Sequence, residues 1–502
     1  EDRSGNLASH APVKDYERRG NLSLTLTGTI SRSLPAFCSF AIALALADCG
    51  RTQPPAAPGM VPATAGAIAA RRVVPPPLRA VRVAEYIHHV VIVIQENRTF
   101  DNLFATFPGA DGTRYGQMKS GSKEVRIELK AVPLDGLCDF GHSYGTYLGD
   151  YDRGLMDGFN LEGGSKKCPG KAGTAPYQYV TPSQIRPYWD IAHQYVLADH
   201  LFTTQGSGSF TAHQDLIAGG TTIDKTKTEA LVDFPTHLPW GCDAPAGTVT
   251  SLLLAGSPPK YESDAGPFPC LKYATLRDLL DARSITWKYY SPPEPHGTGA
   301  LWDAFDAIKA VRDGPEWKTN VTHQPTVIFS DISNGELPAV SWVVADDVNS
   351  DHPGDASDAG PSWVASIVNA VGESKYWRST AVIVVWDDWG GFYDHVRPPF
   401  FDRWGGLGFR VPMLVVSGYS REGSQKHPGY ISHSQYEFGS ILRFVENIWN
   451  LGRLGTTDSR ATSIGDCFDF AQSPRTFKRI SSSYSREYFE RQPPSYEPVD
   501  SQ

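Results

Sequence analysis

The sequence has no excess of basic residues, because 46 lysines and arginines stand against 55 aspartates and glutamates, for a formal net charge of −9. A nucleic-acid partner usually requires a strongly basic surface, so we expect none. An anionic substrate remains compatible with this charge, since a bound cation reverses the local potential. The 47 glycines and 38 prolines among 502 residues favour a loop-rich globular enzyme over a helical bundle.

Apolar runs of membrane-spanning length are also missing. The run Leu34–Ala47 is too short to span a bilayer comfortably, and it has the length of a signal-peptide core. We therefore predict an N-terminal extension with a signal peptide over 1–49 and a Pro/Ala-rich linker over 50–82; a buried helix is the alternative. The protein is then exported, periplasmic or secreted. Lipid anchoring at Cys49 stays open, although Asp48 stands where a small residue is expected.

The cysteines lack the CxxC and CxxH spacings that indicate a structural zinc site. In an exported chain, Cys138 could pair with Cys168, and Cys242 could pair with Cys270. Each bridge would close a loop of about thirty residues and stabilise the fold by roughly 3 kcal/mol. Cys467 is left over, and we expect it to be buried.

Apolar runs and helical patterns alternate along the rest of the chain, which predicts an α/β sandwich with a mainly parallel sheet. Strands are predicted at His89–Ile94, Ser284–Tyr290, Pro338–Val344, Thr380–Trp386 and Val411–Gly418. Helices are predicted at Thr275–Arg283, Gly360–Ser374 and Ser434–Trp449. The catalytic domain would cover 83–477, and the polar tail 478–502 would wrap the surface or fray.

Polar side chains directly follow two of these strands. Glu96 and Asn97 come after the first strand, and Asp387 and Asp388 come after Thr380–Trp386. Ligands of parallel α/β sheets bind at the carboxyl ends of the strands, so we expect these four side chains to converge. Carboxylate and amide oxygens suit one divalent cation such as Mg²⁺, Ca²⁺ or Mn²⁺. The alternative is that both segments are ordinary polar turns.

A nucleophile is predicted in the segment "GSGSFTAH", where Ser209 precedes a helical pattern. A serine at a helix N-terminus lies at the positive end of the helix dipole, where a phosphoryl group is stabilised. A metal ion there would lower the pKa of the hydroxyl. Ser207 is the rival in the same loop, and a helix-capping serine without chemistry is the alternative.

Three histidines lie in segments rich in glycine, aspartate and proline: His142, His352 and His395. Such residues can bind phosphate oxygens or protonate a leaving alkoxide, although each could instead be a surface histidine. The acidic segment Ala345–Asp358 lacks the ligand order of an EF-hand, so we expect it to be a solvated loop that carries His352.

Several segments, taken in order, resemble the bacterial phosphoesterase family that contains phospholipase C-like enzymes and a branch of acid phosphatases. The resemblance covers about His89 to Phe477. It is carried by "ENRTFDNLFATFPGADG", "HSYGTYLGDYDRGLMDGF", "GSGSFTAH", "SDHP", "WDDWGGFYDHVRPP" and "GFRVPMLVVS". It implies an alkaline-phosphatase-like three-layer sandwich.

The resemblance also implies residue roles. Glu96, Asn97, Asp387 and Asp388 would hold the metal ion together with Ser209, which would be the phosphorylated nucleophile. His142 and His352 would hold or protonate the phosphate, with His395 as a weaker candidate. The substrate would be a phosphomonoester or a phospholipid head group, and the latter would bring peripheral membrane contact.

The chain departs from the family pattern at two places that bear on the substrate. Thr211 and Ala212 replace a Pro-Asn pair, and Tyr289-Tyr290 stands where the acid phosphatase branch carries two histidines. Two other functions stay open. A sulfatase on the same fold would need a Cys/Ser-x-Pro-x-Arg segment, which "GSGSFTAH" does not supply. An exported protein that binds cations or surfaces without catalysis is the other alternative.

Overall fold

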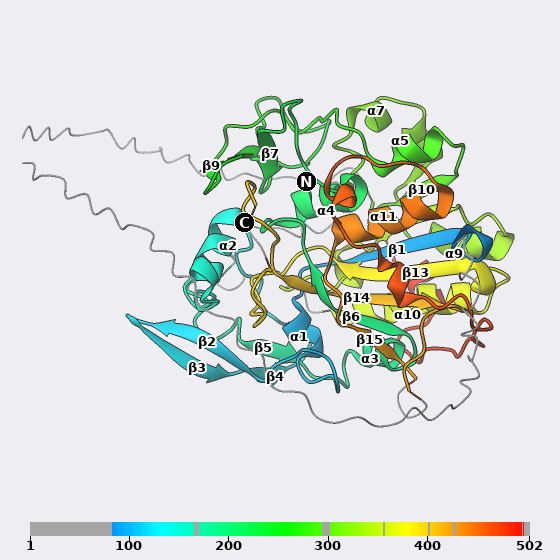
Figure 1. The fold of residues 1–502 in the computed structure, drawn as a ribbon, viewed down its shortest axis with the longest axis horizontal. Helices are drawn as coiled ribbons and strands as arrows, with labels where there is room; N and C mark the ends of the chain where they lie inside the picture. The colour runs from blue at the N-terminus through cyan, green and yellow to red at the C-terminus, as the bar shows by residue number, and fades with distance from the viewer. Residues whose placement is uncertain are drawn as a thin grey trace, which may run out of the picture. The chain divides into compact units, whose positions relative to one another are not determined.

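The computed structural model describes residues 83–164, 170–293, 302–354, 357–399, 402–424, 428–493 and 495. The predicted signal peptide and linker lie outside this part of the chain. Within it, a nine-stranded sheet forms the centre of the molecule, in the order β11-β10-β12-β1-β13-β14-β6-β15, with β16 also paired to β6. Figure 1 shows this sheet with the helices packed around it.

The sheet is mainly parallel, as predicted. β1 lies at its centre and pairs in parallel with β12 and β13, whereas β14 runs antiparallel to both of its neighbours, β13 and β6. The strands are β1 (His89–Gln95), β6 (Val196–Phe202), β10 (Trp287–Tyr290), β11 (Val321–Thr322), β12 (Val340–Val344), β13 (Thr380–Trp386), β14 (Arg410–Ser417), β15 (Tyr430–Ser432) and β16 (Tyr436–Glu437). β1, β12, β13 and β14 are buried almost throughout, which explains their continuous apolar sequences.

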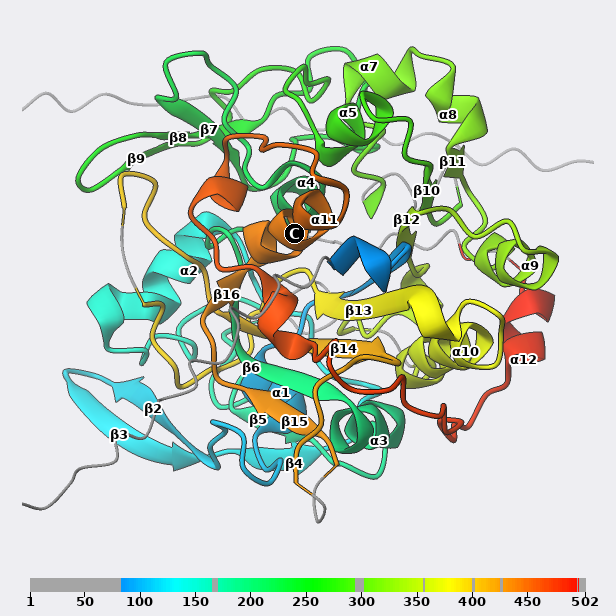
Figure 2. The same cartoon turned by 45° about the vertical axis from the view of Figure 1, so that its right-hand side comes forward.

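Helices cover both faces of the sheet, which confirms the predicted sandwich. The helices α4 (Ser209–Ala218) and α11 (Phe438–Trp449) contact each other on one side, and α3 (Arg186–Gln194) and α10 (Gly360–Gly372) contact each other on the other. The rotated view separates the two pairs (Figure 2). The remaining α-helices of the described residues are α1 (Phe100–Phe104), α2 (Tyr144–Tyr151), α5 (Leu276–Asp281), α7 (Lys309–Arg312), α8 (Glu316–Thr319), α9 (Val327–Asn334) and α12 (Arg486–Arg491).

Three small sheets lie outside the central one. They are formed by β2 (Tyr115–Ser120) with β3 (Lys123–Glu128), by β4 (Lys130–Val132) with β5 (Gln178–Val180), and by β7 (Glu229–Val232), β8 (Ser251–Leu254) and β9 (Lys260–Glu262). Figure 2 shows β2–β3 and β7–β9 at the same side of the molecule as α2. None of these strands was predicted from the sequence.

Two predicted boundaries are wrong for local reasons. β10 begins at Trp287 rather than Ser284, because Ser284 adopts a φ of 54° in the turn after α5 and cannot be part of a strand. The predicted helix Ser434–Trp449 begins only at Phe438, because Tyr436 and Glu437 pair with β6. The backbone N–H of Glu437 donates to Ser440 Oγ at 3.0 Å as part of a capping box.

The predicted disulfide between Cys242 and Cys270 is present, and Cys467 is a buried free cysteine, as expected. Cys138 is also disulfide-bonded, but its expected partner Cys168 lies outside the described residues. In the described part of the tail, the ring of Phe489 packs on Trp363 of α10 at 5.3 Å. No helix of the described residues combines the length and apolar character needed to cross a membrane.

Candidate active site

The polar segments after β1 and β13 lie next to each other. Gln95 and Trp386, the last residues of the two strands, are paired in register, so Glu96-Asn97 and Asp387-Asp388 leave the same edge of the sheet. Asn97 has a φ of 57°, and the chain turns back on itself at Gly390. A Cβ at Gly390 would lie 2.3 Å from the carbonyl oxygen of Asn97, so only glycine fits this approach.

Polar side chains of three residues, Glu96, Asn97 and Asp387, converge at this edge. The backbone N–H of Asn97 donates to Asp387 Oδ1 at 2.9 Å. One atom of the Asn97 side-chain amide lies 3.2 Å from Glu96 Oε2 and 3.1 Å from Asp387 Oδ1. With the amide nitrogen of Asn97 in this position, the amide donates to the carboxylates of Glu96 and Asp387. With the amide oxygen there, oxygens of Glu96, Asn97 and Asp387 meet with no proton between them. The second arrangement needs a cation, and all three residues are buried.

His213 completes this group, although it was not among the predicted site residues. Its Nε2 lies 3.0 Å from Glu96 Oε1 and 3.8 Å from Asp387 Oδ2. Ligand atoms of Glu96, His213 and Asp387 all lie within 4.8 Å of one another. Asp387 Oδ2 is buried and has no hydrogen-bond partner among the described residues. An orphaned carboxylate oxygen in a set of carboxylate, amide and imidazole donors fits a divalent metal ion.

Ser209 lies against this group. It is the first residue of α4, and Gly208 is the helix N-cap. The hydroxyl of Ser209 lies 3.3 Å from Asn97 Oδ1 and 3.2 Å from Asp388 Oδ2. The rival Ser207 is occupied elsewhere, because its hydroxyl accepts hydrogen bonds from the Thr211 hydroxyl and the Asp233 N–H at 2.7 and 2.8 Å.

His142 and His352 face the same group through their Nε2 atoms. His142 Nε2 lies 3.3 Å from Asn97 Nδ2 and 3.9 Å from Asp388 Oδ2. His352 Nε2 lies 3.1 Å from the other end of the Asn97 amide. In each ring Nδ1 lies beside a backbone carbonyl, that of Phe140 at 2.8 Å for His142 and that of Pro353 at 2.7 Å for His352. These carbonyls fix the proton on Nδ1 and leave Nε2 directed to the site.

The segment that carries His352 is buried, so the predicted solvated loop is wrong. Asp346, Asp347 and Asp351 are all buried, and the Asp351 carboxylate accepts from the Tyr188 hydroxyl and the Trp386 indole N–H. Burial raises the pKa of Asp351 to about 6, against the opposing charge of Arg98. The acidic composition thus reflects a loop held inside the protein by hydrogen bonds rather than one covered by water.

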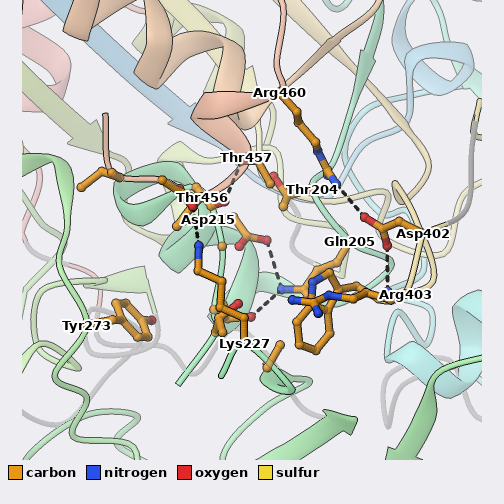
Figure 3. A pocket seen from close by; sticks show the side chains of 18 of the residues that line it. Thr204, Gln205, Asp215, Lys227, Tyr273, Asp402, Arg403, Thr456, Thr457 and Arg460 are labelled. Atoms are coloured by element: carbon orange, nitrogen blue, oxygen red, sulfur yellow. Dashed lines mark hydrogen bonds and ion pairs between the residues drawn. The ribbon is translucent and has the colours of Figure 1, made fainter. Parts of the chain in front are cut away.

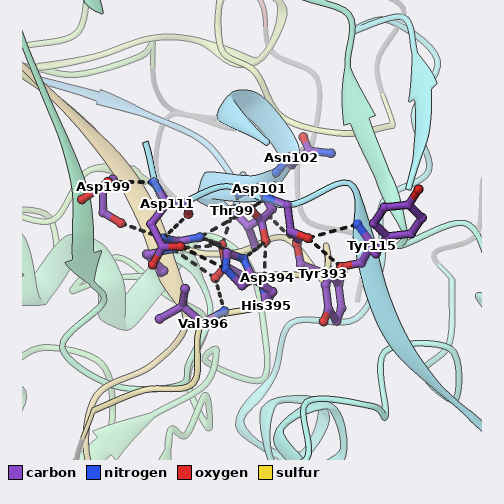
Figure 4. A network of polar contacts seen from close by, with 12 residues as sticks. Thr99, Asp101, Asn102, Asp111, Tyr115, Asp199, Tyr393, Asp394, His395 and Val396 are labelled. Carbon is purple, nitrogen blue, oxygen red and sulfur yellow. Dashed lines mark hydrogen bonds and ion pairs between the residues drawn. The ribbon is translucent and has the colours of Figure 1, made fainter. Parts of the chain in front are cut away.

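His395 lies in a different network (Figure 4). Its Nδ1 is 2.7 Å from Asp101 Oδ2, and its Nε2 is 3.3 Å from Asp111 Oδ1. Burial lowers the pKa of His395, but the hydrogen bond and charge of Asp101 and the charge of Asp394 outweigh burial and raise it to about 9. Arg410 Nε lies 3.1 Å from Asp394 Oδ1. The positive charges of His395 and Arg410 therefore neutralise the carboxylates of Asp101 and Asp394. Because Asp101 belongs to α1, the network links the loop after Asp388 to that helix.

Trp302 packs against two of the site histidines. Its ring lies parallel to His213, with centroids 6.4 Å apart and an interplanar angle of 4°, and its centroid is 5.8 Å from that of His352. The spacing of His213 four residues after Ser209 places both on one face of α4, and this spacing is the signal that could have identified His213 from the sequence. No sequence pattern pointed to Trp302.

The chain matches the model of the Phosphoesterase family over residues 87–452. It belongs to this family. It is 25% identical over 448 residues to phospholipase C B of Mycobacterium tuberculosis, covering 78% of this chain and 79% of the relative. It is 24% identical over 442 residues to a non-hemolytic phospholipase C of Pseudomonas aeruginosa, covering 77% and 57%.

Family membership makes the protein a phosphoric ester hydrolase, as predicted, in preference to the sulfatase and the non-enzymatic binding protein. Among solved structures, the chain is similar to a protein of the alkaline phosphatase superfamily from Vibrio parahaemolyticus, with a TM-score of 0.33 and 9% identity over 76% of this chain and 72% of the other. A lipoteichoic acid synthase from Listeria monocytogenes gives a TM-score of 0.32 and 8% identity over 73% and 72%.

Proposed function

We propose that the protein is a metal-dependent phosphodiesterase of the phospholipase C type that acts through a phosphoserine at Ser209. The observation that carries the proposal is the convergence of ligand atoms of Glu96, His213 and Asp387 within 4.8 Å of one another, next to Asn97, which the Ser209 hydroxyl contacts. Asp387 Oδ2 in this group has no hydrogen-bond partner among the described residues. An ordinary polar turn would place a donor against that oxygen, because a buried carboxylate oxygen without a donor is destabilising.

The ion would be held by Glu96, Asn97, Asp387 and Asp388, with His213 beside them and Ser209 as the reactive ligand. Once bound, a divalent cation would supply charge that lowers the pKa of the Ser209 hydroxyl and neutralises the phosphate. Asp388 is fixed for this role because its Oδ1 accepts from the Gly390 N–H at 2.7 Å, which leaves Oδ2 for the serine.

The chemistry would be an in-line displacement. Ser209 Oγ forms a bond to phosphorus while the bond from phosphorus to the leaving alkoxide breaks. Nε2 of His142 and Nε2 of His352 face the place where the phosphoryl oxygens would lie. With the Nδ1 proton held by a backbone carbonyl, each ring would donate from Nε2 to these oxygens, or return that proton to the alkoxide, in its doubly protonated form. Water then hydrolyses the phosphoserine, and the N-terminus of α4 stabilises the phosphate throughout.

The substrate we favour is the phosphodiester of a phospholipid, and the names of the relatives support it. Peripheral membrane contact goes with that substrate. Three leucines lie close in sequence in and after α2: Leu148, Leu155 and Leu161 are 45%, 49% and 48% exposed. Exposed leucines can insert into a lipid interface, and we propose that these three do so.

The protein would act outside the cytoplasm, in the periplasm or after secretion. The support is chemical, because the Cys242–Cys270 disulfide persists in oxidising compartments and is rare in the cytosol. Fractionation of the natural host with an antibody against residues 83–493 would test this location. A protein confined to the cytosolic fraction would contradict it.

The proposed function is tested by comparing two soluble substrates, p-nitrophenyl phosphorylcholine and p-nitrophenyl phosphate, with and without a chelator. We expect faster hydrolysis of the diester, loss of activity with the chelator, and recovery when a divalent ion is returned. Faster hydrolysis of the monoester would assign the protein to phosphatase chemistry. Undiminished activity after complete metal removal would contradict the metal-dependent mechanism.

A further inference from the structure

Asp351 lies directly before His352 and is held through both its backbone and its side chain. Its carbonyl oxygen accepts from Arg98 Nε at 2.7 Å and also from Arg98 Nη2. Its Oδ2 accepts from the Tyr188 hydroxyl at 2.8 Å and from the Trp386 indole N–H at 2.9 Å. Asp351 and its three donors are each at most 1% exposed. Hydrogen bonds at two points of one buried residue fix its place in the fold.

These contacts join the segment of His352 to the ends of both site strands. Arg98 directly follows Asn97, and Trp386 directly precedes Asp387. Because β1 and β13 are paired in register to their last residues, both donors lie at the same edge of the sheet. His352 Nε2 lies 3.1 Å from the side-chain amide of Asn97 at this edge. The place of Asp351 therefore sets the distance between His352 and the residues that follow the two strands.

The third donor, Tyr188, comes from another layer of the molecule. It belongs to α3, which packs on the face of the sheet opposite α4 (Figure 2). Its ring packs edge-on against Trp386, with the ring centroids 5.0 Å apart. Among the described residues, its hydroxyl forms no hydrogen bond to Ser209 or to the residues that would hold the metal ion. An effect of this hydroxyl on the reaction would therefore pass through Asp351.

Neither Tyr188 nor Asp351 is placed to contact a substrate. Both are buried, and neither lines the cavity of about 650 Å³ at the C-terminal end of α4, whose wall includes Asp215 and Tyr273 (Figure 3). A molecule bound in that cavity would not touch them. A substitution of Tyr188 or Asp351 would reach the reaction by displacing other residues.

We propose that Asp351 is a positioning residue for His352, and that Tyr188 supports catalysis through it. The inference rests on the proposed function, in which Nε2 of His352 faces the phosphoryl oxygens. The contact of His352 Nδ1 with the Pro353 carbonyl orients the ring, but it lies within one segment and does not fix where that segment lies. The hydrogen bonds of Asp351 do so, because its partners belong to other elements. A displacement of about 1 Å in a positioned group can cost about a hundredfold in rate.

A purely structural role for these hydrogen bonds would lower the stability of the protein and leave catalysis unchanged. Tyr436→Phe is the matched control for this role. Tyr436 is equally buried, and its hydroxyl donates to Asp466 Oδ1 at 2.6 Å. Tyr188→Phe and Tyr436→Phe each remove one buried hydroxyl, so both should lower the melting temperature by a few degrees.

The test is steady-state hydrolysis by the whole protein with saturating divalent metal. The substrate is whichever of p-nitrophenyl phosphorylcholine and p-nitrophenyl phosphate the wild type hydrolyses faster. For Tyr188→Phe we expect kcat to fall about tenfold, with KM and metal content unchanged, whereas Tyr436→Phe should keep the wild-type kcat. Asp351→Asn keeps an oxygen that can accept from Tyr188 and Trp386, so it should lose less kcat than Asp351→Leu.

A double-mutant cycle with His352→Gln shows whether Tyr188 acts through His352. We expect Tyr188→Phe to cause no further loss of kcat in the His352→Gln background. Equal losses in both backgrounds, or a wild-type kcat for Tyr188→Phe, would overturn the inference and leave the proposed function intact. A wild-type kcat for His352→Gln would instead refute the role of His352 in the proposed function, and the inference with it. Should Asp351→Leu fail to fold, Tyr188→Phe alone still decides the question.

Discussion

The hydroxyl of Ser209 lies 3.2 Å from Oδ2 of Asp388, although 179 positions separate the two residues in the sequence. Asp388 reaches this place because β13 ends beside β1 at the centre of the sheet. Ser209 reaches it as the first residue of α4. A carboxylate that contacts a serine at a positive helix end, beside further carboxylates, is an arrangement suited to activating the hydroxyl for attack on phosphorus.

The Asp387→Asn substitution should weaken metal binding and stabilise the metal-free protein. The variant loses a charged ligand, so we expect metal affinity to fall about tenfold or more. Without metal, the neutral asparagine removes one of the two buried carboxylate charges of Glu96 and Asp387, which should raise the free energy of unfolding by about 1 kcal/mol. Metal analysis after dialysis and urea unfolding with a chelator measure the two effects.

The matched control is Asp458→Asn, which alters an equally buried carboxylate that accepts from the backbone of Thr456. It should leave the metal content unchanged and lower stability. Equal metal content in both variants would show that Asp387 is not a ligand.

His395 should make the stability of the protein depend on pH above neutrality. Its pKa is raised from 6.5 to about 9 in the folded protein, so its contribution is complete below pH 6.5 and is lost as the pH rises through about 9. His395→Gln should therefore lower the melting temperature most below pH 6.5, and the difference from the wild type should shrink toward higher pH. His237→Gln, at an exposed histidine, should show no such trend. A difference that grows with pH would contradict the network.

Most of the central sheet could be predicted from the sequence, because β1, β12, β13 and β14 are continuous apolar runs. β6 was missed because Asp199 and His200 interrupt its run. The Asp199 side chain is needed there, since its carboxylate accepts from the Asp111 N–H at 2.9 Å. Contacts of that kind depend on the tertiary fold, so local sequence patterns do not reveal them.

The pattern of strands predicted which four residues converge, whereas Ser209, His142 and His352 were predicted from the composition of their loops and from the family resemblance. Glu96, Asn97, Asp387 and Asp388 converge because parallel strand ends share an edge. His395 was expected near them, but the chain turns at Gly390 and carries it to Asp101 instead. The contacts of Trp302 with His213 and His352 are tertiary, so no local pattern records them.

Trp302 should support catalysis by holding His213 and His352 in place. Trp302→Phe keeps an aromatic face for both rings, so we expect kcat to fall only a few-fold. Trp302→Leu removes that face, and small displacements of positioned groups cost about tenfold to a hundredfold in kcat. Steady-state kinetics should place the loss in kcat rather than KM, with metal content retained. Equal kcat values for the two variants would rule out ring stacking as its role.

The exposed leucines should matter only on membranes. A triple variant, Leu148→Ser with Leu155→Ser and Leu161→Ser, should hydrolyse phosphatidylcholine vesicles about tenfold more slowly, because each serine removes apolar surface from the lipid contact. Hydrolysis of soluble p-nitrophenyl phosphorylcholine should be unchanged. Leu238→Ser, at a leucine that is 47% exposed on another segment, is the matched control. An equal loss on both substrates would mean that the leucines do not contact lipid.

The most direct test of the phosphoserine mechanism is to quench the enzyme in acid during turnover and locate phosphate by mass spectrometry of its peptides. We predict phosphate on Ser209 in the wild type and in Ser207→Ala, and none in Ser209→Ala, which should also lose turnover while it keeps its metal. Phosphate on another residue, or full turnover by Ser209→Ala, would contradict the assignment of the nucleophile.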